Sequence, residues 1–121
     1  MATRYPRFSY NDEALAPIGT EARNLLQGGV TTGRVFWLRG ITITNTDAAA
    51  GDMYIYDEYT EGAPTATNQR LELYVTATST MKFEFAAPGI KFVTGINAGA
   101  AAHPLDGAFA AYGVTIWGYE E

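Results

Sequence analysis

From residue 34 onward, short runs of β-branched and aromatic residues alternate with breaks rich in Gly, Pro, Asn and Asp. Runs of this composition predict β-strands that are separated by turns. We expect six strands, over residues 34–44, 52–57, 70–76, 80–85, 90–96 and 108–119. Their short and regular spacing is typical of a sandwich or a barrel.

Two of these runs show strict alternation of apolar and polar positions. The apolar residues at every second position are Leu71, Leu73 and Val75 in one run, and Met81, Phe83 and Phe85 in the other. A strand with this period has one dry face and one wetter face. That pattern is typical of antiparallel sheets, because buried parallel strands are apolar on both faces. We therefore predict an all-β, antiparallel sandwich of jelly-roll type.

The alternation changes phase within the stretch RVFWLRGITITNT, over residues 34–46. Phe36 and Leu38 have one parity, Ile41 and Ile43 have the other, and Gly40 lies between the two pairs. One extra residue at a glycine is what a β-bulge inserts, and a bulge would turn both pairs toward the same core. The sequence therefore predicts a long, bent strand with a bulge at Gly40.

Residues 1–33 have a different pattern, since prolines and glycines interrupt any regular element. Residues 20–27 (TEARNLLQ) could form a short helix capped by Thr20. We interpret residues 1–33 as an extended or partly helical N-terminal arm, and residues 34–121 as the sandwich domain. The arm is either a flexible terminus or an extension that packs on a neighbour through the apolar residues Tyr5, Phe8, Tyr10, Leu25 and Leu26.

Length and composition agree with one folded domain, since 121 residues with 47% hydrophobic content suit a single core. The net charge of -5 repels phosphate backbones, so we expect no direct contact with nucleic acid. With no cysteine, the chain has no disulfide framework and no thiolate nucleophile. No stretch has the length of a membrane span or the pattern of a secretion signal, so we expect a soluble, unprocessed chain without membrane contact.

Few residues in the sequence are candidates for catalysis or metal binding. The single histidine, His103, lies in the loop sequence GAAAHPLDG and offers no base beside a nucleophile. Acidic residues gather in two neighbouring loops, and they could hold calcium or supply the carboxylate pair of a glycosidase: Asp47, Asp52, Asp57, Glu58 and Glu61. Their spacing matches no calcium-binding motif, and turn formation explains them equally well. We therefore predict no enzymatic activity, no cofactor and no metal.

Tyrosines on or beside the predicted strands form a second candidate feature. Tyr54 and Tyr56 alternate with apolar residues, so their side chains share one face of a strand. Exposed aromatic side chains mark protein contact surfaces, and they also stack on sugar rings. Half-buried tyrosines at the edge of the core are the structural alternative. We expect Tyr54 and Tyr56 to join the arm residues as contacts with other subunits or with a shell.

Three segments together resemble a family of small virion proteins of tailed bacteriophages. They are WLRGITITNTDAAAGDMYIYDEY, PGIKFVTGINAGA and AAYGVTIWGYEE. In that family a strand of the form RGI.ITN leads to a strand that ends in Asp, a PGIKF..G segment follows, and a V.I.GYE strand closes the chain. The matching residues are Arg39, Gly40, Ile41, Ile43, Thr44, Asn45, Asp57, Pro88, Gly89, Ile90, Lys91, Phe92, Gly95, Val114, Ile116, Gly118, Tyr119 and Glu120.

This resemblance covers residues 34–121 and implies a β-sandwich with a structural role on a virus particle. The implied function is capsid decoration: a homo-oligomer, with a trimer favoured, is made in the host cytoplasm, binds the major capsid protein on the outer surface and stabilises the shell. A head-tail connector or a tail component is the variant within the same class. A carbohydrate-binding jelly-roll module is the alternative from another class, and it would use tyrosines such as Tyr54 and Tyr56.

Overall fold

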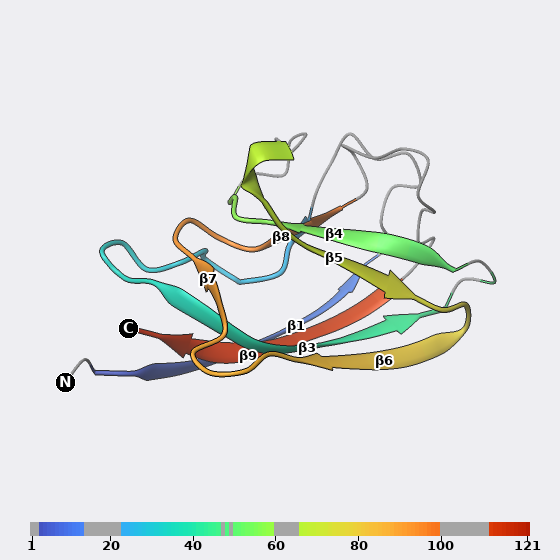
Figure 1. The fold of residues 1–121 in the computed structure, drawn as a ribbon, viewed down its shortest axis with the longest axis horizontal. Coiled ribbons are helices and arrows are strands. Elements are labelled where there is room, and N and C mark those ends of the chain that lie inside the picture. The colour runs from blue at the N-terminus through green and yellow to red at the C-terminus, as the bar shows by residue number, and fades with distance from the viewer. Residues whose placement is uncertain (1–2, 14–22, 47, 49, 60–65, 100–111) are drawn as a thin grey trace.

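The structure is a computed structural model that describes residues 3–13, 23–46, 48, 50–59, 66–99 and 112–121. Within these residues the chain forms two antiparallel sheets that pack face to face as a sandwich (Figure 1). The elements are β1 (Tyr5–Glu13), β2 (Arg23–Asn24), β3 (Phe36–Asn45), β4 (Gly51–Tyr56), η1 (Ala66–Asn68), β5 (Gln69–Val75), β6 (Ser79–Glu84), β7 (Ile90–Phe92), β8 (Asn97–Gly99) and β9 (Tyr112–Glu120). The predicted all-β antiparallel sandwich is confirmed.

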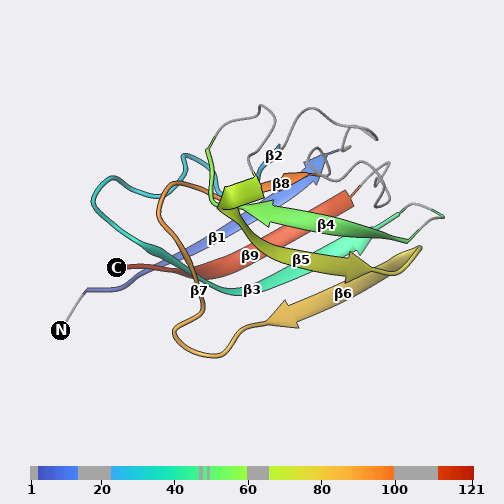
Figure 2. The same ribbon diagram turned by 45° about the horizontal axis from the view of Figure 1, so that its top comes forward.

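The chain crosses repeatedly between the two layers. Sheet A has the strand order β1-β9-β3-β6, with the short β7 also paired to β3, and sheet B has the order β2-β8-β4-β5 (Figure 2). Apart from β7, this is the strand order of an eight-stranded jelly roll built from two Greek keys. The closing strand β9 is therefore central in sheet A, between β1 and β3.

The core lies between the two sheets and consists mainly of aliphatic side chains. Sheet A contributes residues such as Leu38, Ile41 and Ile116, while sheet B contributes residues such as Ile55 and Val75, all fully buried. The alternation predicted for β5 and β6 is present, because the odd-numbered residues face the core and the even-numbered ones face solvent. The two-residue period of the sequence therefore identified the core-facing side of both strands.

The predicted bulge is present in β3. The register with β9 shifts between Leu38 and Gly40, so Arg39 is the extra residue, and the apolar pairs on either side of it are all buried. Glycine is required here for a steric reason rather than for backbone strain. An ideal Cβ at Gly40 would overlap the six-membered ring of Trp117, which covers this position from the neighbouring strand.

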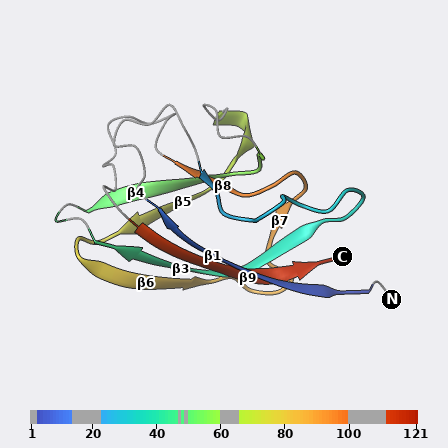
Figure 3. The same cartoon turned by 180° about the vertical axis from the view of Figure 1, so that it is seen from behind.

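The prediction of a separate N-terminal arm is wrong for the described part of residues 1–33. β1 pairs with β9 along its whole length, from Tyr5 opposite Glu120 to Glu13 opposite Tyr112 (Figure 3). Leu25 and Leu26 belong to the core cluster, at 0% and 1% exposure. Residues 23–27 contain the short strand β2 instead of the predicted helix, whose Thr20 cap lies outside the described residues.

The remaining strand predictions agree with the structure to within a few residues at each end. The run predicted over residues 90–96 divides into β7 and a loop. Because it contains no β-branched or aromatic residue, β8 had no sequence signal. The first part of the strand predicted over residues 108–119 lies outside the described residues.

Candidate functional site

The two tyrosines predicted as surface contacts are buried. Tyr54 and Tyr56 are 2% and 0% exposed on β4. Burial raises the pKa of Tyr56 to about 12, and the negative charge of Glu58 adds to the shift. Tyr54 and Tyr56 therefore do not form an exposed aromatic groove. Leu25 and Leu26 are excluded as surface contacts for the same reason, because they fill the protein's own core.

Among the described acidic residues of the two predicted loops, Asp57 lines a pocket of about 340 Å³, whose other lining residues are Arg70, Ile90, Lys91 and Val93 and include no second carboxylate. Asp57 is buried, and its carboxylate accepts hydrogen bonds from the backbone N–H groups of Val93, Thr94 and Gly95. Its second oxygen lies 3.7 Å from a guanidinium nitrogen of Arg70. Asp57 therefore anchors the loop between β7 and β8 to the end of β4, which is a structural role.

Other candidates from the sequence are only partly placed. Asp47, Glu61 and His103 lie outside the described residues. Glu58 accepts a hydrogen bond from Asn68 Nδ2 at 2.8 Å, and Asp52 lies on β4. In the part of the chain that the structure describes, no group of three or more His, Asp or Glu side chains is arranged to hold a metal ion.

Sequence reasoning missed an ion cluster around Glu120, which is buried near the end of β9. Arg7 of β1 donates a hydrogen bond to its Oε1, and Arg34 lies 3.6 Å from its Oε2. Burial would raise the pKa of Glu120, but the hydrogen bonds from Thr31 and Arg7 and the charge of Arg7 outweigh it and lower the pKa. Since Arg7 also donates to Gly29 O at 2.7 Å, the cluster ties β1 and the loop before β3 to β9.

The outer face of sheet A is the most distinctive surface of the molecule. Strand register aligns its side chains in rows across the sheet. One row joins Phe8, Trp117, Gly40 and Glu84, and a second joins Pro6, Tyr119, Trp37 and Lys91. The described residues of this face are aromatic, hydroxyl-bearing or charged, together with one proline and two glycines. Aliphatic side chains are confined to the inner face of the sheet.

Two aromatic side chains of β1 are open to solvent at the edge of sheet A. Phe8 points outward and is 72% exposed, while Tyr5, on the opposite parity, is 42% exposed. The guanidinium of Arg34 lies over the Tyr5 ring, 3.8 Å from its centroid. We call Tyr5 and Phe8 the β1 strip. Tyr10 continues the same strand, but its side chain is outside the described part of the structure.

A pocket of about 390 Å³ lies on the outer face of sheet A. It is lined by Arg39, Glu84, Phe85 and Trp117. The strand order places Arg39 and Glu84 on the far side of Trp117 from β1. We call it the Trp117 pocket. It adjoins the β1 strip, because Trp117 lies directly opposite Phe8 in the register of β1 and β9. The sequence marks Gly40 as unusual, but it does not show that Trp117 lies opposite Gly40 across the sheet. The pocket therefore could not be predicted from the sequence.

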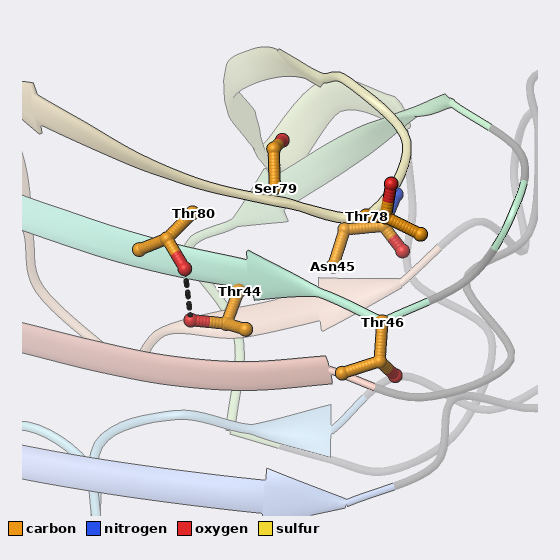
Figure 4. A pocket seen from close by; sticks show the side chains of 6 residues that line it. All are labelled: Thr44, Asn45, Thr46, Thr78, Ser79 and Thr80. Carbon is orange, nitrogen blue, oxygen red and sulfur yellow. Dashed lines mark hydrogen bonds between the residues drawn. The ribbon is translucent and has the colours of Figure 1, made fainter.

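A second, hydroxyl-lined pocket of about 270 Å³ lies where β3 ends and β6 begins (Figure 4). Its lining residues are Thr44, Asn45, Thr46, Thr78, Ser79 and Thr80. The hydroxyls of Thr44 and Thr80 point toward each other and are 2.9 Å apart, so they satisfy each other across the two strands. This pocket contains no charged or aromatic side chain, and its polar groups serve the turn before β6.

Comparison of the chain with protein-family models, with curated proteins and with solved structures gives no match. Within the described residues, no helix has the length and apolar character needed to cross a membrane.

Proposed function

We propose that this protein is a non-enzymatic structural component of a virus particle, and that it decorates and stabilises the outer capsid shell. Its partner would be the major capsid protein, and it would act as a symmetric homo-oligomer, with a trimer favoured. The β1 strip would be the contact with the shell or with a neighbouring subunit. Such a protein would be located on the capsid surface.

The observation that carries this proposal is the exposure of Phe8. A phenylalanine that is 72% exposed on a well-paired strand contributes little to the protein's own core. Aromatic side chains are enriched at protein interfaces, where they bury a large area with little loss of conformational freedom. Phe8 and Tyr5 lie on the edge strand of sheet A, whose outer edge is unpaired within the described residues. An edge strand can also accept a further strand from a partner.

Two further considerations support the same role. Residues 34–121 resemble virion proteins with a β-sandwich fold, and the jelly-roll order of the strands is compatible with that resemblance. The fold alone implies no function, because lectins and other binding proteins share it. Many copies in a symmetric array would bind firmly through avidity, even where each β1 strip contributes a weak contact.

The test is the mass of the protein in solution by light scattering, followed by co-sedimentation with empty shells of the major capsid protein from the same genome. We expect an oligomer that sediments with the shells, and we expect Phe8→Ser to weaken this binding. Tyr74→Ser is the matched control, since Tyr74 is an exposed aromatic residue on sheet B, at 56% exposure. A monomer that ignores the shells would refute the proposal.

A further inference from the structure

The Trp117 pocket has a floor that is fixed by the backbone. The six-membered ring of Trp117 occupies the space where a Cβ at Gly40 would lie, so the indole rests directly on strand β3. One face of the ring is therefore held against the sheet, and the other is turned outward. Lys82 lies over the ring, with its Nζ 5.6 Å from the centroid, so a ligand that stacks there has to move this exposed side chain aside. A fixed, outward-facing indole is a surface on which the C–H face of a sugar ring can stack.

Arg39 supplies a planar donor at the wall of the pocket. As the extra residue of the bulge, it lies on the outer face next to Gly40, so two successive residues of β3 border the pocket. Its Nε donates to Phe85 O at 3.1 Å, and its own carbonyl accepts from Phe85 N at 3.0 Å. In the described part of the chain, its two terminal nitrogens have no hydrogen-bond partner. They form a preoriented fork that matches the two oxygens of a carboxylate.

Glu84 completes the lining with an acceptor. Its carboxylate lies 2.9 Å from Lys82 Nζ. The hydrogen bond from Lys82 and then the charge of Lys82 lower the pKa of Glu84, and Arg39 adds to this effect. The group is therefore ionised at neutral pH, and it can accept hydrogen bonds from hydroxyl groups.

The local charge of this pocket is opposite to that of the chain. The protein has a net charge of -5, yet Arg39 and Lys82 bring two positive charges to this pocket against the single carboxylate of Glu84. Glu84 is the acidic residue among the four pocket-lining side chains. A ligand with a negative charge is therefore favoured over its neutral counterpart. The volume of about 390 Å³ lies in the range of small-molecule sites, roughly 300–1,000 Å³.

We propose that the Trp117 pocket binds a saccharide ring that carries a carboxylate. The ring stacks on Trp117, its carboxylate accepts the two terminal N–H groups of Arg39, and its hydroxyls donate to Glu84. This site differs from the tyrosine groove predicted from the sequence, because it uses the opposite sheet and none of the same residues. It gives the protein a second binding function on the same outer face as Phe8, with lining residues that do not include the β1 strip.

The experiment is isothermal titration calorimetry of the whole chain with acidic saccharides. The probes are oligogalacturonate, a hyaluronan oligosaccharide and sialyllactose, and each is compared with the same saccharide after reduction of its carboxylates to alcohols. At least one acidic probe should bind more tightly than its reduced form by roughly tenfold, as expected for a hydrogen bond to a charged group. Absence of binding by all three acidic probes, or equal binding of an acidic and a reduced probe, would overturn the proposal.

Variants assign the binding to the pocket. Trp117→Ala should abolish binding, and Arg39→Lys should remove the preference for the acidic form, since it keeps the charge but loses the fork. Two controls should bind as the parent does: Lys91→Gln, which removes a charge from the same face outside the pocket, and Tyr74→Ala, which removes an exposed aromatic ring from sheet B.

If Trp117→Ala fails to fold, Arg39→Lys decides the matter, because Arg39 is not part of the core cluster. An Arg39→Lys variant that kept the full acidic preference, or a control variant that lost binding, would contradict the assignment. Tyr5→Ser should leave saccharide binding unchanged, because Tyr5 has the opposite parity to Phe8 and is not a neighbour of Trp117; this variant separates the site from the proposed contact with the capsid shell.

Discussion

The two faces of sheet A have different compositions although they belong to the same strands. The inner face is aliphatic and dry, with residues such as Leu38, Ile43 and Val114 fully buried. Among the described residues, the outer face has aromatic, hydroxyl and charged side chains instead. Burial of aliphatic groups is non-directional and serves stability, whereas aromatic rings and charges have directional contacts and serve recognition. The inner face therefore holds the fold together, and the outer face is the surface for which we propose binding.

Deleting residues 1–13 should have the largest effect, because β1 contributes to both faces. The deletion removes nine paired residues from sheet A and takes Arg7 away from the buried Glu120. Loss of one partner from a buried ion pair alone costs on the order of 3 kcal/mol. We expect loss of the cooperative unfolding transition in thermal circular dichroism. A truncated chain that still unfolds cooperatively would show that β1 behaves as the detachable arm that the sequence suggested.

Alanine substitutions at adjacent positions compare the two faces directly. Ile41 is fully buried on the inner face, and Thr42 lies next to it on the outer face. Ile41→Ala should lower the free energy of unfolding by about 2–5 kcal/mol, because it leaves a cavity in the core. Thr42→Ala should change it by less than about 0.5 kcal/mol. Chemical denaturation measures both values, and similar costs at the two positions would remove the distinction between the faces.

Gly40→Val tests whether the Trp117 ring on the outer face is the reason that β3 has a glycine at position 40. The new side chain would occupy the site of the Trp117 ring, so we expect a loss of roughly 1–3 kcal/mol in the free energy of unfolding. The same substitution in a Trp117→Ala background should cost much less, since the clash is then absent. Equal costs in the two backgrounds would show that backbone conformation, not Trp117, requires glycine.

The two carboxylates Glu120 and Glu84 should contribute differently to the loss of stability in acid. We expect this effect to be smaller than those of the substitutions above. The pKa of Glu120 is lowered in the folded state from the ordinary value of 4.5. Its contribution is therefore present above about pH 4.5 and is lost as the pH falls through the folded-state pKa. In denaturation curves below pH 4.5, Glu120→Gln should flatten the fall in stability, while Glu84→Gln should flatten it less, because the ion pair of Glu84 with Lys82 is exposed to solvent. The reverse ranking would contradict the role of Glu120 in the core.

The parts of the fold that could be predicted from the sequence are those that depend on the residue pattern within a single strand. Alternation in β5 and β6 and the phase change at Gly40 follow directly from the two-residue period of a strand. Pairing between strands that lie far apart in the sequence produces no comparable pattern. The sequence of β1 favours an arm, because Pro6 and polar residues interrupt it and its partner β9 lies at the other end of the chain. The Trp117 pocket was invisible for the same reason, since it combines residues from β3, β6 and β9.

The contact residues were predicted from hydrophobicity, which cannot tell a core position from an exposed one. Leu25, Leu26, Tyr54 and Tyr56 are apolar and buried, as their side chains favour, while Phe8 and Tyr5 are equally apolar and exposed. Only the register of β1 against β9 shows that Phe8 points away from the core. On an edge strand, the pairing with the one neighbouring strand determines which aromatic side chains face the core and which stay exposed.

The most direct test of the account is hydrogen–deuterium exchange of the protein, free and bound to empty capsid shells. The account predicts that peptides covering β1 are protected in the free protein, as expected for a paired strand, and gain further protection on the shell. Peptides covering β5 on sheet B should be unchanged by binding. Rapid exchange of β1 in the free protein, or new protection at β5 with none at β1, would contradict the claim that β1 is both part of the sandwich and its contact with the shell.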